Sequence, residues 1–238
     1  MSEETVKISR ALVVAAHPDD PEFGAGGTIA KWASDGIDVY IALTTNGNKG
    51  TPDPTMSGER LAAIRREEQL AAAAAAGALE VAFLDNNDCE LENNLVLRGQ
   101  IVRLIRRYRP DVVITHDPRP IVSRGRFLNH PDHRATGQAT LDAIYPSARD
   151  PLHYPDHITE GLQPHKVLDI YLWGSTEPDT WVDISGSFEK KLAALRCHAT
   201  QINNPEELEK RIRERAQQTA EGHEMELAEA FCRIQLPR

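Results

Sequence analysis

The sequence predicts an α/β fold in which a mostly parallel sheet carries helices on both faces. Short apolar runs rich in valine, isoleucine and leucine alternate with longer amphipathic segments. Apolar runs of this length are typical of strands buried on both faces. Their alternation with helical segments indicates right-handed crossovers between parallel strands. The predicted strands are residues 11–16, 39–45, 81–84, 111–116 and 167–173.

Helical patterns fill the segments between the first strands. The predicted helices are residues 26–36, 57–77 and 95–110. Glycine ends the first two of them and proline ends the third, and both residue types are helix-stop signals. The second helix contains six consecutive alanines. Alanine is the best helix former, so this run lets the helix pack closely against a sheet.

The rest of the chain is less regular. Residues 117–129 and 145–165 show no repeating pattern, and long loops of this kind tend to be functional or mobile. A strongly charged helix is expected over about residues 205–232, supported by opposite charges four residues apart. That helix would be a solvated face or a subunit contact, which would allow a homo-oligomer. The length of 238 residues predicts a single domain over residues 1–238.

Bulk composition narrows the function. A net charge of −9 disfavours nucleic acid as a partner, because phosphate binding needs a basic field. No apolar run approaches the roughly 18 residues of a membrane span, and the N-terminus lacks the pattern of a signal peptide. A small-molecule substrate and a cytoplasmic location are therefore expected. Cys89, Cys197 and Cys232 have no CxxC spacing, so we expect them to be structural bystanders.

Histidine and aspartate gather where the predicted strands end. "HPDD" follows the first strand, "THD" follows the fourth, and "HPDH" opens the next helical segment at residues 130–133. Ligands of open parallel sheets collect at the carboxyl ends of the strands. Alone, each motif would more often be a turn or a helix cap with surface histidines. Their joint occurrence at one edge favours a functional site.

The first of these motifs suggests a metal centre. His17 and Asp20 are three residues apart on a turn shaped by Pro18, and His133 could add a third ligand. Two histidines, one carboxylate and an open fourth position are typical of catalytic zinc. Zinc lowers the pKa of its bound water to about 7, and a neighbouring carboxylate can take the proton. Asp19 is the candidate for that base.

Two more residues of the later motif have predicted roles. His130 lies one helical turn before His133, and near a metal it could stabilise an oxyanion or protonate a leaving amine. Asp132 is within reach of an orienting role behind a ligand.

The glycine-rich segment "GAGGT" at residues 24–28 has a separate explanation. It lets the backbone pass close to a ligand or lets the next helix pack tightly on the sheet. A dinucleotide fingerprint would need glycine at position 29, where Ile29 stands, and no suitable acidic residue ends the second strand.

These motifs together resemble the PIG-L/LmbE-like superfamily of zinc-dependent N-acetylglucosaminyl deacetylases. The resemblance spans about residues 10–201. The family's usual glutamate after the two aspartates is displaced here, because Pro21 precedes Glu22. The matching segments are "AHPDD" (16–20), Arg65 with Glu68, "FLDNND" (83–88), "DVVITHDP" (111–118), "HPDHRA" (130–135) and "KLAALRCHATQ" (191–201).

The resemblance implies a Rossmann-like fold and hydrolysis of an acetamide on an amino sugar or its conjugate. It implies one zinc ion, or another divalent ion, on the metal triad named above, and the same roles for Asp19 and His130. It also implies sugar contacts for Arg65 and Asp88.

Three other functions stay open at this stage. One is an amidase of the same fold that cleaves a bulkier acyl group from a sugar or thiol conjugate. Another is a metal phosphoesterase, although few fixed basic residues lie near the cluster. The third is a sugar-binding module without catalysis, which the presence of a base and three ligands disfavours.

Overall fold

The computed structural model describes residues 8–123 and 127–237. Nine strands and eight helical segments lie within them. The strands are β1 (Arg10–Ala15), β2 (Asp38–Thr45), β3 (Glu80–Asn86), β4 (Val112–His116), β5 (Val122–Ser123), β6 (Phe127–Leu128), β7 (Asp169–Trp173), β8 (Thr180–Asp183) and β9 (Ala228–Gln235). The helical segments are α1 (Asp20–Ser34), α2 (Gly58–Ala76), α3 (Leu95–Tyr108), α4 (Pro131–Asp142), η1 (Ala143–Ser147), α5 (Pro155–Thr159), α6 (Phe188–Arg196) and α7 (Pro205–Ala220).

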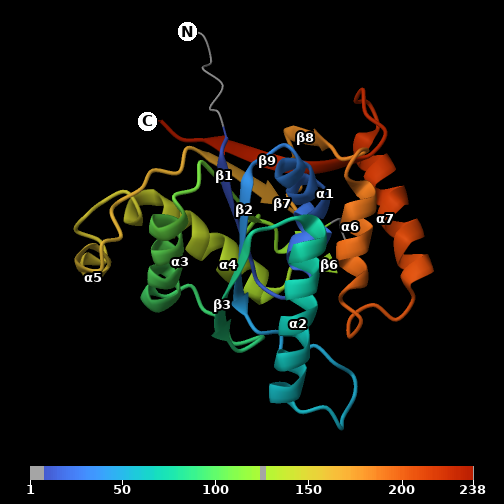
Figure 1. Ribbon diagram of the computed structural model, residues 1–238, viewed down its shortest axis with the longest axis horizontal. Coiled ribbons are helices and arrows are strands. Elements are labelled where there is room, and N and C mark those ends of the chain that lie inside the picture. The colour runs from blue at the N-terminus through green and yellow to red at the C-terminus, as the bar shows by residue number, and fades with distance from the viewer. Residues whose placement is uncertain (1–7, 124–126, 238) are drawn as a thin grey trace.

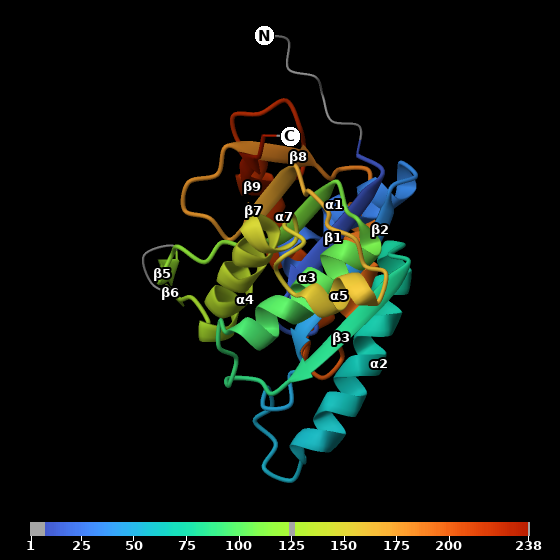
Figure 2. The same cartoon turned by 90° about the vertical axis from the view of Figure 1, so that its left-hand side faces the viewer.

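One seven-stranded sheet runs through the centre of the molecule in the order β3-β2-β1-β4-β7-β9-β8. The five strands from β3 to β7 pair in parallel, and β9 runs antiparallel to both of its neighbours. Helices cover both faces, with α3 and α4 on one side and α1, α2, α6 and α7 on the other (Figures 1 and 2). The predicted α/β fold with a mostly parallel sheet is confirmed.

Two apolar cores separate the sheet from its helices. Alternate residues of β1 point to opposite faces, so Val13 joins the core beneath α1 and α2, whereas Leu12 and Val14 join the core beneath α3 and α4. The alanine run of α2 contributes Ala72, Ala73 and Ala76 to the first core, as expected for a helix that packs closely on a sheet.

The strand order places a ligand crevice between β1 and β4. From β1 the chain proceeds to β2 and β3 on one side, then returns to β4 and β7 on the other. Crossover helices leave in opposite directions from such a switch point, so the carboxyl ends of the two central strands are open. The loops that follow β1 and β4 therefore face each other.

Helix α1 starts earlier than expected. It begins at Asp20, and the backbone of Ala25 breaks its regular geometry, so the predicted helix from residue 26 is the second half of α1. A Cβ atom on Gly24 would lie 2.7 Å from the Trp173 indole, and one on Gly27 would lie 2.7 Å from Ile184. These two glycines thus serve close packing of α1.

The predicted C-terminal helix over about residues 205–232 is wrong in its second half. Helix α7 ends at Ala220, and residues 228–235 form β9. Phe231 of β9 is fully buried, and Ile234 pairs with Ile170 of β7. The charged pattern continues past Gly222, so the sequence predicted more helix there. Residues 228–235 instead pair with the edge of β7, and this edge becomes available only when the chain folds.

The two predicted loops contain short elements. Residues 117–129 include the β5–β6 pairing, and residues 145–165 include part of η1 and helix α5. Arg106 is 2 % exposed and donates to backbone carbonyls of the second loop, including those of Ser147 and Asp150. Among the described helices, none combines the length and the apolar character that crossing a membrane requires.

Candidate active site

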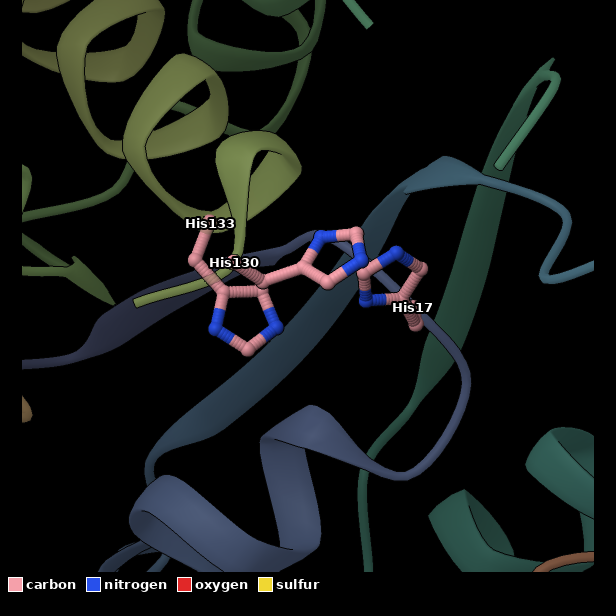
Figure 3. A group of neighbouring side chains, drawn as sticks. All are labelled: His17, His130 and His133. Carbon is pink, nitrogen blue, oxygen red and sulfur yellow. The ribbon is translucent and has the colours of Figure 1, made fainter. Parts of the chain in front are cut away.

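The polar residues of three distant segments meet at the carboxyl ends of β1 and β4. His17 lies between β1 and α1, while His130 and His133 lie at the N-terminus of α4. Figure 3 shows the three imidazole rings gathered at one place, although more than 110 residues separate the two motifs. Suitable nitrogen atoms of the three rings lie within 4.8 Å of one another.

Of the three predicted metal ligands, His17 and His133 both contact the third, Asp20. Its Oδ2 atom is 3.1 Å from His17 Nδ1, and its Oδ1 atom is 3.2 Å from His133 Nε2. Burial disfavours its charge, but the neighbouring His133 and His116 and the hydrogen bonds with His133 and His17 hold the pKa of Asp20 well below its usual value. The Asp20 carboxylate thus lies between the two imidazoles and contacts one nitrogen of each ring.

His116, at the end of β4, is a site residue whose role the sequence did not assign. Its Nε2 atom is 3.6 Å from Asp20 Oδ2, and its ring stacks on His133 with centroids 4.2 Å apart. However, Nε2 accepts a hydrogen bond from the backbone N–H of Ala16 at 3.0 Å. That nitrogen is therefore already engaged. Burial and the nearby His133 lower the pKa of His116 well below its usual value, so it forms a neutral wall of the site.

Two carboxylates hold the far side of His17. Its Nε2 atom lies 3.2 Å from both Asp88 Oδ1 and Asp132 Oδ2. Burial opposes a charge on this ring, but hydrogen bonds to Asp132, Asp20 and Asp88 raise the pKa of His17 to about 12. Without a metal the ring therefore carries a proton on each nitrogen. A cation bound at Nδ1 would displace that proton and leave Nε2–H on the carboxylates, which is the usual carboxylate–histidine–metal arrangement.

The local charge balance fits a cation. The carboxylates of Asp20, Asp88 and Asp132 surround a small group of imidazoles, and the pKa values of all three carboxyl groups are lowered despite their burial. Asp132 is fully buried, and its Oδ1 atom has no hydrogen-bond partner among the described residues. Buried polar atoms normally have partners, so this donor set fits a divalent ion.

Asp19 directly precedes Asp20 and has a strained backbone. Its φ of 98° is unusual for a residue with a side chain, and its backbone N–H donates to Gln69 Oε1 at 3.1 Å. Burial and the charge of Asp20 raise the pKa of Asp19 to about 7, against the opposing effect of Arg65. This value suits a group that exchanges protons near neutral pH.

Arg65 lies under the loop of Asp19. It is 3 % exposed, and its Nη2 atom is 2.5 Å from the carbonyl oxygen of Pro18 and 3.3 Å from Asp19 Oδ2. Its Nη1 atom donates to the carbonyl of Gly47. These contacts make Arg65 a support for the loop, and its predicted sugar contact stays a prediction, as does that of the buried Asp88.

His130 caps α4 and has a defined tautomer when neutral. Its Nδ1 atom accepts the backbone N–H of Asp132 at 3.2 Å, so the proton of the neutral ring is on Nε2. Burial and the charges of His17 and His133 lower the pKa of His130, which favours this neutral form. Its Nε2–H group is thus a hydrogen-bond donor at the site.

A buried chain of polar residues links the loop after β1 to His198, which follows α6. Glu22 is fully buried and contacts Gln69 Nε2 at 2.8 Å and His198 Nε2 at 3.0 Å. Gln69 in turn holds the backbone of Asp19. The insertion of Pro21 therefore leaves the glutamate packed beneath the site. In the sequence, only the position of Glu22 close to the two aspartates suggested that it supports the site. No sequence feature indicated a role for Gln69.

Two neighbouring cavities lie at the site and share part of their lining. The smaller, about 190 Å³, is lined by Asp20 and His133 together with Asn129 and Trp173. The larger, about 410 Å³, lies between β8, β9 and α7, and it shares Phe23, Gly24 and Trp173 with the smaller one. A ligand that reaches Asp20 and His133 therefore has further space in the larger cavity.

Comparisons with known proteins agree with this geometry. The family model described as PIG-L: GlcNAc-PI de-N-acetylase matches residues 12–144. A diacetylchitobiose deacetylase of Thermococcus kodakarensis is 36% identical over 196 residues, which are 82% of this chain and 71% of that protein. A 1D-myo-inositol 2-acetamido-2-deoxy-alpha-D-glucopyranoside deacetylase of Rhodococcus erythropolis is 29% identical over 83% of each chain. The solved structure of N,N'-diacetylchitobiose deacetylase from Pyrococcus horikoshii has a TM-score of 0.88 and 31% identity, covering 96% of this chain and 85% of that one.

The family match covers more than half of the 238 residues and includes both histidine motifs. It confirms the resemblance found in the sequence, and with it the expectation of an amide-hydrolysing enzyme. The chain belongs to the PIG-L family.

Proposed function

We propose that this protein is a metal-dependent N-deacetylase that releases acetate and a free amine from an N-acetylglucosamine-type sugar or conjugate. One observation carries the proposal: His17 Nδ1 and His133 Nε2 each lie within 3.2 Å of the Asp20 carboxylate, and the charges of Asp20 and His17 act on the carboxylate of the preceding Asp19. The named relatives deacetylate diacetylchitobiose and an acetamido-glucopyranoside of inositol, which supports an amino-sugar substrate.

His17, Asp20 and His133 would hold the divalent ion, and zinc is the metal that this donor set favours. The chemistry supplied by such an ion is Lewis acidity, which polarises an amide carbonyl and makes water easier to deprotonate. Asp88 and Asp132 orient His17 by accepting its Nε2–H.

Asp19 would take one proton from the attacking water, because its pKa of about 7 lets it accept and return a proton near neutral pH. The neutral His130 ring would donate its Nε2–H to the amide oxygen as negative charge develops there. When the carbon–nitrogen bond breaks, the proton held by Asp19 passes to the leaving nitrogen. Water thereby supplies the hydroxyl of acetic acid and one proton of the amine.

A substrate screen with metal analysis tests this proposal. The protein would be purified with zinc, its metal content measured, and acetate release followed with N-acetylglucosamine, N,N'-diacetylchitobiose and inositol- or thiol-linked N-acetylglucosamine. We expect one tightly bound divalent ion per chain and acetate from at least one of these compounds. The variant His133→Ala should lose both the ion and the activity.

The same screen addresses the other functions. Glucosamine with bulkier N-acyl groups tests the amidase of the same fold, and a phosphate monoester tests the phosphoesterase. Metal-loaded protein that binds the sugars but releases no acetate would contradict the proposal and favour a sugar-binding module.

Three expectations from the sequence stay predictions: a single domain over residues 1–238, assembly of several copies, and a cytoplasmic location. Light scattering of the purified protein would measure the number of copies.

A further inference from the structure

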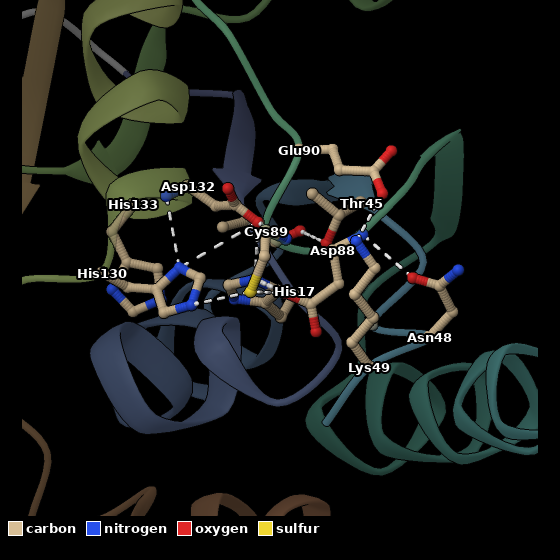
Figure 4. A network of polar contacts seen from close by, with 12 residues as sticks. His17, Thr45, Asn48, Lys49, Asp88, Cys89, Glu90, His130, Asp132 and His133 are labelled. Atoms are coloured by element: carbon tan, nitrogen blue, oxygen red, sulfur yellow. Dashed lines mark hydrogen bonds and ion pairs between the residues drawn. The ribbon is translucent and has the colours of Figure 1, made fainter. Parts of the chain in front are cut away.

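Cys89 lies at the rim of the candidate active site, where the sequence indicated a bystander. It is exposed and follows β3 in a short turn. Its Sγ atom is 3.2 Å from Asp88 Oδ1 and 3.6 Å from His130 Nε2 (Figure 4). Thiol, carboxylate and imidazole thus meet on the side of His17 that faces away from Asp20.

The turn holds this sulfur in place. Cys89 has a φ of 62°, in the left-handed region, and its backbone N–H donates to Asp132 Oδ2 at 2.7 Å. The backbone N–H of Asp88 donates to Asn48 Oδ1 at 3.0 Å, which ties the turn to the loop after β2. A strained backbone held from both sides is typical of a position with a functional constraint.

We propose that Asp88, Cys89 and His130 form a second metal site, distinct from the His17–Asp20–His133 triad, for a thiophilic divalent cation such as Zn²⁺ or Cd²⁺. The three ligand atoms lie within 4.8 Å of one another. A thiolate and a carboxylate supply two negative charges, and imidazole with thiolate suits these cations. Cys89 releases its thiol proton to solvent when the ion binds.

Binding also rearranges the proton of His130. An ion at Nε2 requires the ring proton to sit on Nδ1, which now accepts from the backbone N–H of Asp132. Asp132 Oδ2 lies 4.0 Å from Nδ1, and Asp132 Oδ1 has no partner among the described residues. A small rotation of the ring therefore brings Nδ1–H to the carboxylate, which offsets the lost cap.

Occupancy of this site inhibits the enzyme, a consequence that rests on the proposed function. The second ion takes the Nε2 atom of His130, so that atom no longer donates to the developing oxyanion. It also fixes Asp88, which orients His17. Excess zinc thus inhibits, whereas the first equivalent activates.

Cadmium titration tests the binding without any substrate. Protein already loaded with one zinc ion would be titrated with Cd²⁺ while the ultraviolet cadmium–thiolate band and the bound metal are measured. The wild type should develop the band and bind a second ion per chain. Cys89→Ser should lose both, while the matched controls Cys197→Ser and Cys232→Ser keep them. A band that is missing from the wild type, or that persists in Cys89→Ser, overturns the site.

Zinc titration of the activity tests the inhibition. Cys89→Ser and Cys89→Ala should match the wild type at one zinc per chain, but tolerate a zinc excess that is roughly 10–100-fold higher. Equal inhibition of wild type and both variants overturns the inhibitory role. Because the cadmium measurement needs no turnover, protein that releases no acetate contradicts the proposed function while the metal site is still tested.

Discussion

Two groups of charged side chains contact helix α1, and they differ in how completely the charges are paired. At its first turn, Asp20 faces His17 and His133 beside a cavity. At its kink, Glu229 of β9 accepts hydrogen bonds from the backbone N–H groups of Gly27 and Thr28, both at 2.8 Å. The two groups thus contact the same helix, one beside a cavity and the other in the packed interior.

The group around Glu229 is closed. Besides the backbone donors, its carboxylate contacts Thr28 Oγ1 at 2.6 Å and Lys191 Nζ at 2.5 Å, and Lys191 is 4 % exposed. The group around Asp20 is open, with an excess of carboxylates and an Asp132 oxygen that has no partner in the part of the chain that the structure describes. A closed network stabilises a fold, whereas an open one keeps negative charge available for a cation.

The largest effect is expected from Asp19→Asn in the open group. The amide keeps the shape of the side chain but cannot take a proton, so kcat should fall by about 10²–10⁴-fold. Bound zinc and the urea midpoint should stay close to those of the wild type. Normal turnover in this variant would show that Asp19 is not the base. The open group would then have no demonstrated role in catalysis.

A smaller effect is expected from Glu229→Gln in the closed group, and here stability falls instead of turnover. This change leaves the buried ammonium of Lys191 without its counter-charge, which should lower the free energy of unfolding by about 3 kcal/mol. Urea unfolding would measure the loss, and bound zinc per folded chain should not change. The matched control is Glu226→Gln, because Glu226 is exposed on the approach to the same strand. Equal stability of both variants would show that the closed network contributes nothing.

The smallest effect is expected at Asp111, which precedes β4 at the amino ends of the parallel strands, away from the candidate active site. Its Oδ2 atom accepts from Ser9 N–H at 2.7 Å, Ser9 O–H at 2.8 Å and Arg10 N–H at 3.0 Å. Burial opposes the charge, but these donors lower the pKa of Asp111. Its contribution to stability is therefore present above the unfolded pKa of about 3.9 and is lost as the pH falls through the lower folded value.

Asp111→Asn tests whether hydrogen bonds to a carboxylate that is only partly buried stabilise the fold. We expect a loss of about 1 kcal/mol or less at pH 7 and a smaller fall in stability on acidification than in the wild type. Thermal unfolding at pH 7 and at acidic pH would measure both. An unchanged pH dependence would contradict the assigned role of this carboxylate.

Much of the parallel half of the sheet was predictable. Helix α2 extends over Gly58–Ala76 between the N-cap Ser57 and the left-handed Gly77, close to the expected 57–77. The five predicted strands correspond to β1, β2, β3, β4 and β7. Apolar runs and helix caps depend on residues that are close together in the chain, so they can be recognised from one sequence. The antiparallel strands β8 and β9 escaped prediction, because their pairing depends on the exposed edge of β7.

The two histidine motifs were likewise legible, because residue types and short spacings restrict the chemistry available to His17, Asp20 and His133. The positions of Cys89, His116 and Gln69 depend instead on contacts between segments far apart in the chain. Local spacing carries no information about which distant turn comes to rest against a motif. Tertiary packing alone therefore decided which side chains complete the site and which carboxylates have hydrogen-bond partners. It also left Asp132 Oδ1 without a partner among the described residues.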